Sequence, residues 1–400
     1  MSLSFFFNTP KAPNSPLTGA INDFTKEVYF DLAANFQRNA IISPLSLHMA
    51  LGLTLFGSKD ETSYAIMKGL QIKNPDTLLN DYKNIIEQLT KSPELKVANK
   101  IYFRQEVQLD PNYETGALQY FNSALGKVDF NQSQSAADQI NMWVAKQTNN
   151  TINNLIGPSN ITSDTMLLLI NAIYFKGTWV NTFKRNNTKN KPFYLTETHS
   201  IRVPMMYIKE EFIMQVEAGD EGFAMLELPY GTKQEQRFSM HIFLPNKRSG
   251  LAVLEKKFFQ TNESFADKFG NIVNNGFKTK VEVTLPRFKI TSFWNMTNLC
   301  KKLGMGVAFT PSADFSQMTL NNSPLCISDV IQKAFIEVNE EGTVASAATA
   351  VTMLFAGPRV PEKPITFIAD HPFFVTISTT NTRDILFVAK VAGSDAFEIK

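Results

Sequence analysis

The fold of this 400-residue chain is decided by the segment Glu340-Glu341-Gly342-Thr343-Val344-Ala345-Ser346-Ala347-Ala348-Thr349-Ala350. Residues 334–339, just before it, alternate large apolar and polar side chains, as a half-buried strand does. A segment that slides between two strands cannot carry large or charged side chains on its inward face without clashing or burying charge. Every second residue from Thr343 to Thr349 would share one face of a strand, and all of these are small. The pattern therefore predicts a loop that can become a strand.

An alanine-rich helix is the alternative for the same residues. Alanine has the highest helix propensity, and the acidic pair Glu340 and Glu341 would suit the start of a helix. Gly342 and the β-branched Thr343 and Val344 argue mildly against it. Composition alone leaves both interpretations open.

Further motifs follow one another in a fixed order along the chain. They are NAIISPLS (39–46), NAIYFKGTW (171–179), ELPYG (227–231), HIFLP (241–245), VTLPRF (283–288), ADHPF (369–373) and ILFV (385–388). Together with residues 335–350, which resemble the proximal hinge of the serpins, this ordered set resembles the serine protease inhibitor family over nearly the whole chain. The resemblance is greatest to invertebrate members.

The resemblance implies an α+β serpin fold with three β-sheets, about eight or nine helices and an exposed reactive-centre loop over about residues 341–364. It implies one serpin domain over residues 18–400, after a flexible N-terminal extension over residues 1–17. No stretch rich in Pro, Gly or Ser separates two apolar halves, so one large domain is expected in spite of the length.

The same resemblance implies a suicide-substrate inhibitor of serine proteases, not an enzyme. A protease cuts the loop to an acyl-enzyme, the freed loop inserts as a strand in the main sheet, and the protease stays covalently trapped; serpin loop insertion is itself a standard example of strand addition. The alternative is a non-inhibitory serpin that acts as a carrier or binding protein. Small residues over 345–350 favour the inhibitor, because a carrier has no need to keep that face insertable.

Individual residues take roles from the resemblance. Gly342 is the expected pivot and Thr343 the first side chain to enter the sheet. The expected shutter and breach residues, whose alternative roles are ordinary helix capping and core packing, are Ser43, Ser46, Asn171, Trp179 and Gln332. Gln332 stands where many members have a histidine and cannot become charged, so any pH sensitivity of opening is expected to be weaker. Val344 stands where an acid is common, at a position expected to face outward.

The scissile bond is expected between Ala356 and Gly357, from the family's usual distance to the pivot glycine. A small residue there suits an elastase-like protease. A shift to Phe355 would suit a chymotrypsin-like protease, and Arg359 a trypsin-like one only if the loop were longer than usual. Pro358 and Pro361 restrict how Arg359 could lie in a protease cleft.

Composition and motifs exclude several functions. The net charge of +2 is too small and evenly spread to indicate nucleic acid as a partner. The four histidines lie far apart, and the chain has no nucleophile elbow, Walker loop or zinc motif, so no metal, cofactor or catalytic residue is expected. No stretch is long enough to span a membrane.

We expect a monomer. The basic residues Lys184, Arg185, Lys189 and Lys191 favour a solvated face, and glycosaminoglycan binding stays unsupported.

Localisation is expected to be extracellular, with cytoplasmic as the alternative. Seven Asn-x-Ser/Thr sequons permit glycosylation; they begin at Asn131, Asn149, Asn160, Asn186, Asn262, Asn295 and Asn321. The start of the chain, Met1-Ser2-Leu3-Ser4, leads into too short an apolar run for a signal peptide. Two cysteines are too few to indicate the redox compartment.

Periodicity predicts mixed secondary structure. Apolar residues from Ile21 to Phe36 form one helical stripe, and Ser135 with Asp138 resembles a capping box of a second helix. Residues 97–103 and 166–175 read as strands, the second almost wholly apolar and so buried on both faces. Strands are expected to dominate from about residue 202 to residue 286.

Overall fold

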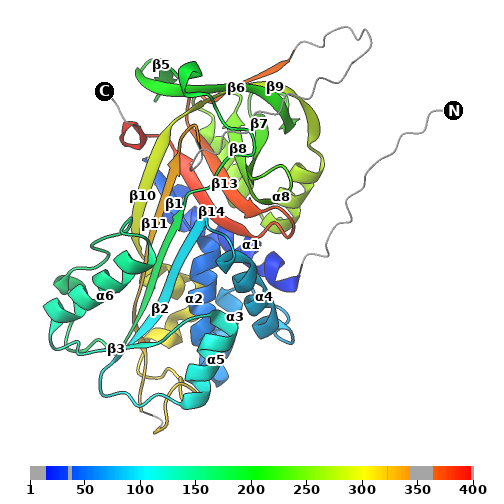
Figure 1. The fold of residues 1–400 in the computed structure, drawn as a ribbon. Coiled ribbons are helices and arrows are strands. Elements are labelled where there is room, and N and C mark those ends of the chain that lie inside the picture. Colours follow the sequence, from blue (N-terminus) through cyan, green and yellow to red (C-terminus); the bar gives the residue numbers. More distant parts are fainter. Residues whose placement is uncertain (1–14, 35–37, 322, 342–363, 398–400) are drawn as a thin grey trace.

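The computed structural model describes residues 15–34, 38–321, 323–341 and 364–397 (Figure 1). The α-helices in these ranges are α1 (Pro16–Tyr29), α2 (Pro44–Phe56), α3 (Asp60–Gly69), α4 (Leu78–Thr90), α5 (Pro111–Phe121), α6 (Ser133–Gln147), α7 (Leu251–Phe259), α8 (Phe265–Asn274) and α9 (Thr297–Cys300). The strands are β1 (Ala40–Ile42), β2 (Leu95–Arg104), β3 (Gly126–Val128), β4 (Leu167–Phe175), β5 (Lys189–Tyr194), β6 (Ser200–Val216), β7 (Phe223–Gly231), β8 (Gln236–Pro245), β9 (Phe277–Pro286), β10 (Phe288–Asn295), β11 (Ile327–Val338), β12 (Ile365–Ile368), β13 (Phe373–Thr379) and β14 (Ile385–Val391).

Hydrogen bonds join the described strands into two sheets. The smaller has five strands in the order β10-β11-β4-β2-β3. The larger runs β1-β14-β13-β8-β7-β6-β9-β12, with β5 also on β6. Strand β6 pairs with β9 along Met205–Met214 and with β7 only over Ile213–Val216, so two parts of the larger sheet meet near the end of one long strand. The predicted third sheet is not separate from the larger sheet, and one of these two parts takes its place.

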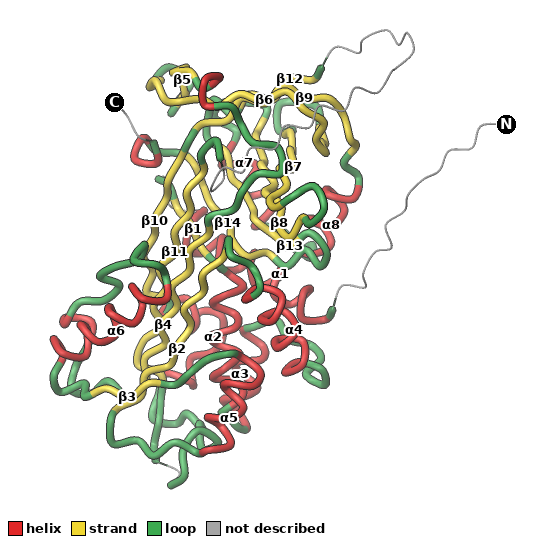
Figure 2. Tube along the Cα trace, viewed as in Figure 1, coloured by secondary structure: helices red, strands yellow, loops and turns green. Residues whose placement is uncertain are grey.

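The five-stranded sheet lies between two helical layers (Figure 2). Alternate residues of β4 face opposite ways: Leu168 and Ile170 pack with α6, whereas Leu167 and Leu169 belong to the larger core that includes α2. Because both faces are covered, the strand is apolar almost throughout, as its sequence indicates.

Helix α2 lies at the centre of the molecule. Every residue from Pro44 to Leu55 is buried, which fits a helix that is apolar all round. Its start is the predicted one, since the Ser43 hydroxyl accepts a hydrogen bond from the Ser46 amide and Pro44 occupies the first turn. This start places Ser43 and Ser46 directly beneath the five-stranded sheet.

Two local predictions differ from the structure. Helix α6 begins at Ser133 after Gln132, so Ser135 and Asp138 lie inside the helix and form no capping box. The apolar stripe belongs to α1, which ends at Tyr29 and continues into a π-helical turn over Phe30–Ala34. Strands dominate residues 202–286 as predicted, with the helices α7 and α8 between β8 and β9. No helix in the described ranges is both long enough and apolar enough to cross a membrane.

Candidate functional site: the shutter and the hinge anchor

The candidate site begins with two parallel strands at the middle of the five-stranded sheet. Strands β11 and β4 pair in parallel from Ile327 opposite Leu167 to Ile336 opposite Phe175. Their outer neighbours, β10 and β2, are both antiparallel to them. The chain leaves β11 at Val338 and enters residues 340–350. The small-residue segment therefore starts at the end of this parallel pair.

Four predicted residues meet beneath the pair in a buried polar network, which we call the shutter: Ser43, Ser46, Asn171 and Gln332. The amide group of Gln332 donates to the Ser43 carbonyl at 2.9 Å and to Asn171 Oδ1 at 2.6 Å, while its Oε1 accepts from the Ser43 amide at 3.0 Å. Ser46 Oγ donates to Asn171 Oδ1 at 2.9 Å. The bond from Gln332 to Asn171 runs directly from β11 to β4.

Two shutter partners escaped prediction. Asn99 on β2 accepts a hydrogen bond from Asn171 Nδ2 and donates to the Ser46 carbonyl at 3.3 Å. The Ser43 hydroxyl donates to the carbonyl of Leu386 on β14 at 2.7 Å, which ties α2 to the larger sheet. Asn99 lies in a strand with no motif around it, and the adjacent Lys100 is polar as well, so no sequence signal marks Asn99.

Trp179 lies apart from the shutter, in the segment after β4, and contacts the residues that follow β11. Its indole donates to the carbonyl of Asn339 at 2.8 Å and stacks on Tyr230 with ring centroids 4.0 Å apart. Trp179 and Phe183 also donate from their backbone amides to the carbonyls of Glu341 and Glu340, at 3.4 Å and 3.0 Å. The segment after β11 is thus held by backbone contacts as well as by side chains, and the breach role of Trp179 stays a prediction.

Glu340 is a buried charge with its own partners. Its carboxylate accepts from Arg287 Nε at 2.7 Å, from a second nitrogen of the same guanidinium, and from the hydroxyl of Thr188. Burial alone would raise the pKa of this carboxyl, but the hydrogen bonds from Arg287 and Thr188 outweigh it and lower the pKa below its ordinary value. We call the contacts of Glu340 and Glu341 the hinge anchor.

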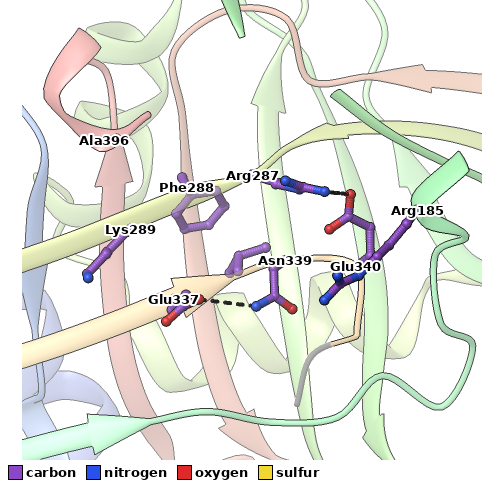
Figure 3. A pocket seen from close by; sticks show the side chains of 9 residues that line it. Arg185, Arg287, Phe288, Lys289, Glu337, Asn339, Glu340 and Ala396 are labelled. Atoms are coloured by element: carbon purple, nitrogen blue, oxygen red, sulfur yellow. Dashed lines mark hydrogen bonds and ion pairs between the residues drawn. The ribbon is translucent and has the colours of Figure 1, made fainter. Parts of the chain in front are cut away.

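Glu341 is held more loosely. Its carboxylate lies 2.7 Å from Arg185 Nη2, with the Glu341 side chain 35% exposed and that of Arg185 71% exposed. Arg185, Arg287 and Glu340 line a pocket of about 170 Å³ beside the end of β11 (Figure 3). An exposed pair of this kind contributes little to stability, about 0 to 1 kcal/mol.

Most of the predicted hinge and the scissile bond lie outside the described residues. This applies to Gly342, Thr343 and the following residues to Thr349, and to Phe355, Ala356, Gly357 and Arg359. Their roles remain predictions. Within the described ranges, no group of three or more His, Cys, Asp or Glu side chains is arranged to hold a metal ion.

Comparison with known proteins identifies the family. The family model described as "Serpin (serine protease inhibitor)" matches residues 19–393. Serpin B4 of Homo sapiens is 32% identical over 399 residues, which cover 94% of this chain and 99% of that protein. Antichymotrypsin-2 of Bombyx mori is 31% identical over 357 residues, covering 88% and 92% of the two chains. The chain therefore belongs to the serpin family, and its relatives include invertebrate members, as the motifs predicted.

Solved structures confirm the α+β serpin fold. Serpin48 of the insect Tenebrio molitor matches with a TM-score of 0.82 and 31% identity, over 95% of this chain and 99% of that one. Uncleaved ovalbumin matches with a TM-score of 0.81 and 27% identity, over 94% and 99%. Human thyroxine-binding globulin matches with a TM-score of 0.82 at 24% identity, over 95% and 99%, and shows the fold alone.

Proposed function

We propose that this serpin is a suicide-substrate inhibitor of a serine protease. In this proposal the loop at about residues 341–364 is cut between Ala356 and Gly357, and the part from Gly342 onward inserts between β11 and β4. The observation that carries the proposal is the parallel pair with an anchored chain exit at its end.

The parallel arrangement suits insertion. A segment that turns back after Val338 runs antiparallel to β11 and, because β4 is parallel to β11, antiparallel to β4 as well. It would replace one parallel ladder with two antiparallel ladders, and antiparallel pairing is slightly more stable per residue. Strand β11 has 12 residues, or about 40 Å of ladder at about 3.3 Å per residue.

Insertion releases enough free energy to distort a protease. A net gain of about one hydrogen bond per inserted residue, at about 1 kcal/mol each, gives on the order of 10 kcal/mol before packing is counted. A typical protease domain is stable by roughly 5 to 15 kcal/mol. In this proposal the intact fold is metastable and is protected by a kinetic barrier.

The shutter supplies part of that barrier. The bond from Gln332 to Asn171 joins the two strands that must separate, and both residues are completely buried. Breaking it leaves buried amide groups without partners, which costs about 1 to 3 kcal/mol for each group. Opening therefore has to be driven by the incoming strand.

The loop sequence determines which class of serine protease would be the target. Ala356 favours an elastase-like protease, Phe355 a chymotrypsin-like one, and Arg359 a trypsin-like one. The names of two Bombyx mori relatives, Antichymotrypsin-2 and Antitrypsin, point to two of these classes, so the relatives do not select one.

We further propose an extracellular location. Six of the seven sequon asparagines are exposed, namely Asn131, Asn149, Asn186, Asn262, Asn295 and Asn321. Asn160 is half-buried and accepts a hydrogen bond from the Gly157 amide. Mass spectrometry of protein from its natural source, before and after enzymatic deglycosylation, would detect glycans at the exposed sites, whereas unmodified asparagines at all of them would favour a cytoplasmic protein.

The decisive experiment is incubation with elastase, chymotrypsin and trypsin in separate reactions. A complex that survives denaturing electrophoresis is expected with one of them, and the first residue of the released C-terminal peptide would distinguish cleavage after Phe355, Ala356 or Arg359. Cleavage of the loop without any complex would support the carrier.

A matched pair of variants tests the insertion step. Thr343→Arg places a charge on the face expected to enter the sheet, so the protein should become a substrate that is cut and released. Val344→Arg places the same charge on the opposite face and should still trap the protease. Equal trapping by both variants would show that the hinge begins elsewhere.

A further inference from the structure

We propose that His241 is an acid-sensitive switch that controls whether α8 stays packed on the larger sheet. His241 lies on β8 with its side chain only 2% exposed, and α8 packs against it beside β7, β8 and β13 (Figure 1). The switch acts on α8 and not on the pair of β11 and β4, so the proposal is independent of protease inhibition.

The imidazole of His241 is buried without a hydrogen bond. Neither Nδ1 nor Nε2 has a hydrogen-bond partner among the described residues. In the same part of the structure, the hydroxyl of Thr376, opposite His241 on β13, also has no partner, and neither has the hydroxyl of Ser378 two positions along that strand. An imidazolium would need acceptors for two N–H groups and would carry a full charge, so this environment favours the neutral ring.

Two charged side chains act on His241, one from β7 and one from the turn between β13 and β14. Glu227 on β7 has Oε2 at 3.9 Å from the ring Nε2, beyond hydrogen-bond distance, and its Oε1 already accepts from the Ser239 hydroxyl at 2.7 Å. Desolvation is the main reason that the pKa of His241 is lowered; Glu227 acts in the opposite direction, and Arg383 in the turn lowers the pKa further. The histidine is therefore neutral while α8 is in place.

Helix α8 packs on the sheet through a narrow apolar stripe, which consists of Phe265, Phe269 and Val273. Phe269 meets the ring of His241 edge-on, with centroids 5.1 Å apart, and contributes no charge. Arg383 Nη1 donates to the carbonyl of Gly270 at 3.2 Å, which ties the helix to the same turn. A helix of 10 residues is not stable without its packing, so α8 is an element that can open locally while the rest of the fold persists.

Acid should favour the state in which α8 is detached. His241 then reaches water and regains the ordinary histidine pKa of about 6.5. The detached state binds a proton more readily than the packed state, so the packed state loses stability as pH falls below about 6.5. One proton raises the population of the detached state by up to about tenfold per pH unit, or up to about 30-fold between pH 7.5 and pH 5.0.

The test is hydrogen exchange of the whole protein, read by mass spectrometry from pH 7.5 to pH 5.0 and corrected for the intrinsic pH dependence of amide exchange. Protection of residues 265–274 should fall by about 10- to 30-fold at pH 5.0, while residues 44–56 of α2 should keep theirs. His241→Met fills the site with a neutral side chain, so the protection of α8 should no longer depend on pH. A fall of less than about threefold in the parent protein would overturn the proposal.

Two further variants separate His241 from other titrating groups. His241→Gln is a second neutral replacement, which keeps the test valid if methionine disturbs the packing. His199→Gln is the matched control, because His199 is exposed before β6 and should leave the pH profile unchanged. If a folded His241 variant kept the pH profile of the parent protein, another group would open α8. If α2 lost protection together with α8, the transition would be global; either result contradicts the switch.

Discussion

At the scale of single residues, Gln332 sets the chemistry of the shutter. It is completely buried and bonds to Ser43 and Asn171 through neutral groups. A glutamine does not titrate, so the rate at which β11 and β4 separate should be nearly constant from pH 5.5 to pH 8. We expect Gln332→His to separate the strands faster as pH falls through the histidine range of about 6.5, because a buried imidazolium in the shutter is unfavourable.

The rate can be followed by the uptake of a synthetic peptide that copies residues 343–354. Gln332→Asn serves as the control, since it disturbs the same contacts without adding a titrating group. A pH-dependent rate in the unchanged protein would show that another residue controls opening.

Glu340 gives a second prediction at this scale. Its lowered pKa means that the folded state favours the ionised carboxylate, so this stabilisation is present above the ordinary carboxyl pKa and is lost as pH falls through the folded-state pKa. Glu340→Gln should cost about 1 to 3 kcal/mol at pH 7 through the lost contacts with Arg287. Thermal unfolding at pH 7.5 and pH 3.5 checks the sign, because the difference between the two proteins should shrink at the lower pH.

The sequence indicates some residues of these polar networks but not the partners that they contact. Ser43 and Asn171 could be predicted because each lies in a motif of the family, and Gln332 because it stands where many members have a histidine. Arg287 lies in a motif too, but nothing in the sequence joins it to Glu340, 53 positions away. Thr188 and Asn99 have no motif. Partners in a polar network become visible only when the strands that carry them are placed side by side.

At the scale of elements, the segment after α6 covers the strands that must separate. Lys333 on β11 donates from Nζ to the carbonyls of Asn153 and Asn154, at 3.0 Å and 3.4 Å. Desolvation lowers the pKa of this lysine, which fits its half-buried position beneath the segment. Lys333→Met should release the segment and speed amide hydrogen exchange over residues 150–156 several-fold.

Lys146→Met is the control for that measurement, since Lys146 is exposed in the last turn of α6. Exchange rates that respond equally to both substitutions would argue that general loosening of α6, and not the contact with Lys333, holds the segment.

Helices and strands could be predicted where the pattern of apolar residues was long and uniform. Strand β4 matches its prediction to within one residue because its apolar run is unbroken. Helices α7 and α8 were missed because they have only 9 and 10 residues, and α7 is rich in the aromatic and branched side chains that also favour strands. The capping box near Ser135 failed because α6 begins before it.

At the scale of the whole molecule, the order of the strands in the sheets could not be predicted from the periodicity of apolar residues. Strand β1, near residue 40, pairs with β14, near residue 388, and no local pattern records such a pairing. The family motifs supplied what periodicity could not, because their order along the chain is tied to one arrangement of strands. They did not show that β6 joins two parts of one sheet, since that depends on four register pairs at the end of a 17-residue strand.

The last prediction also belongs to the whole molecule. If the loop inserts after cleavage, the cut protein should be more stable than the intact one, although cleavage of a loop ordinarily destabilises a protein. A gain on the order of 10 kcal/mol, divided by an unfolding entropy of about 2.1 cal/mol/K per residue over the chain, raises the melting temperature by roughly 10 to 15 °C. Differential scanning calorimetry before and after limited proteolysis measures this, with Thr343→Arg as the control that should be cut without the rise. An unchanged melting temperature in the cut parent protein would mean that β11 and β4 stay paired. That result would favour a carrier over an inhibitor.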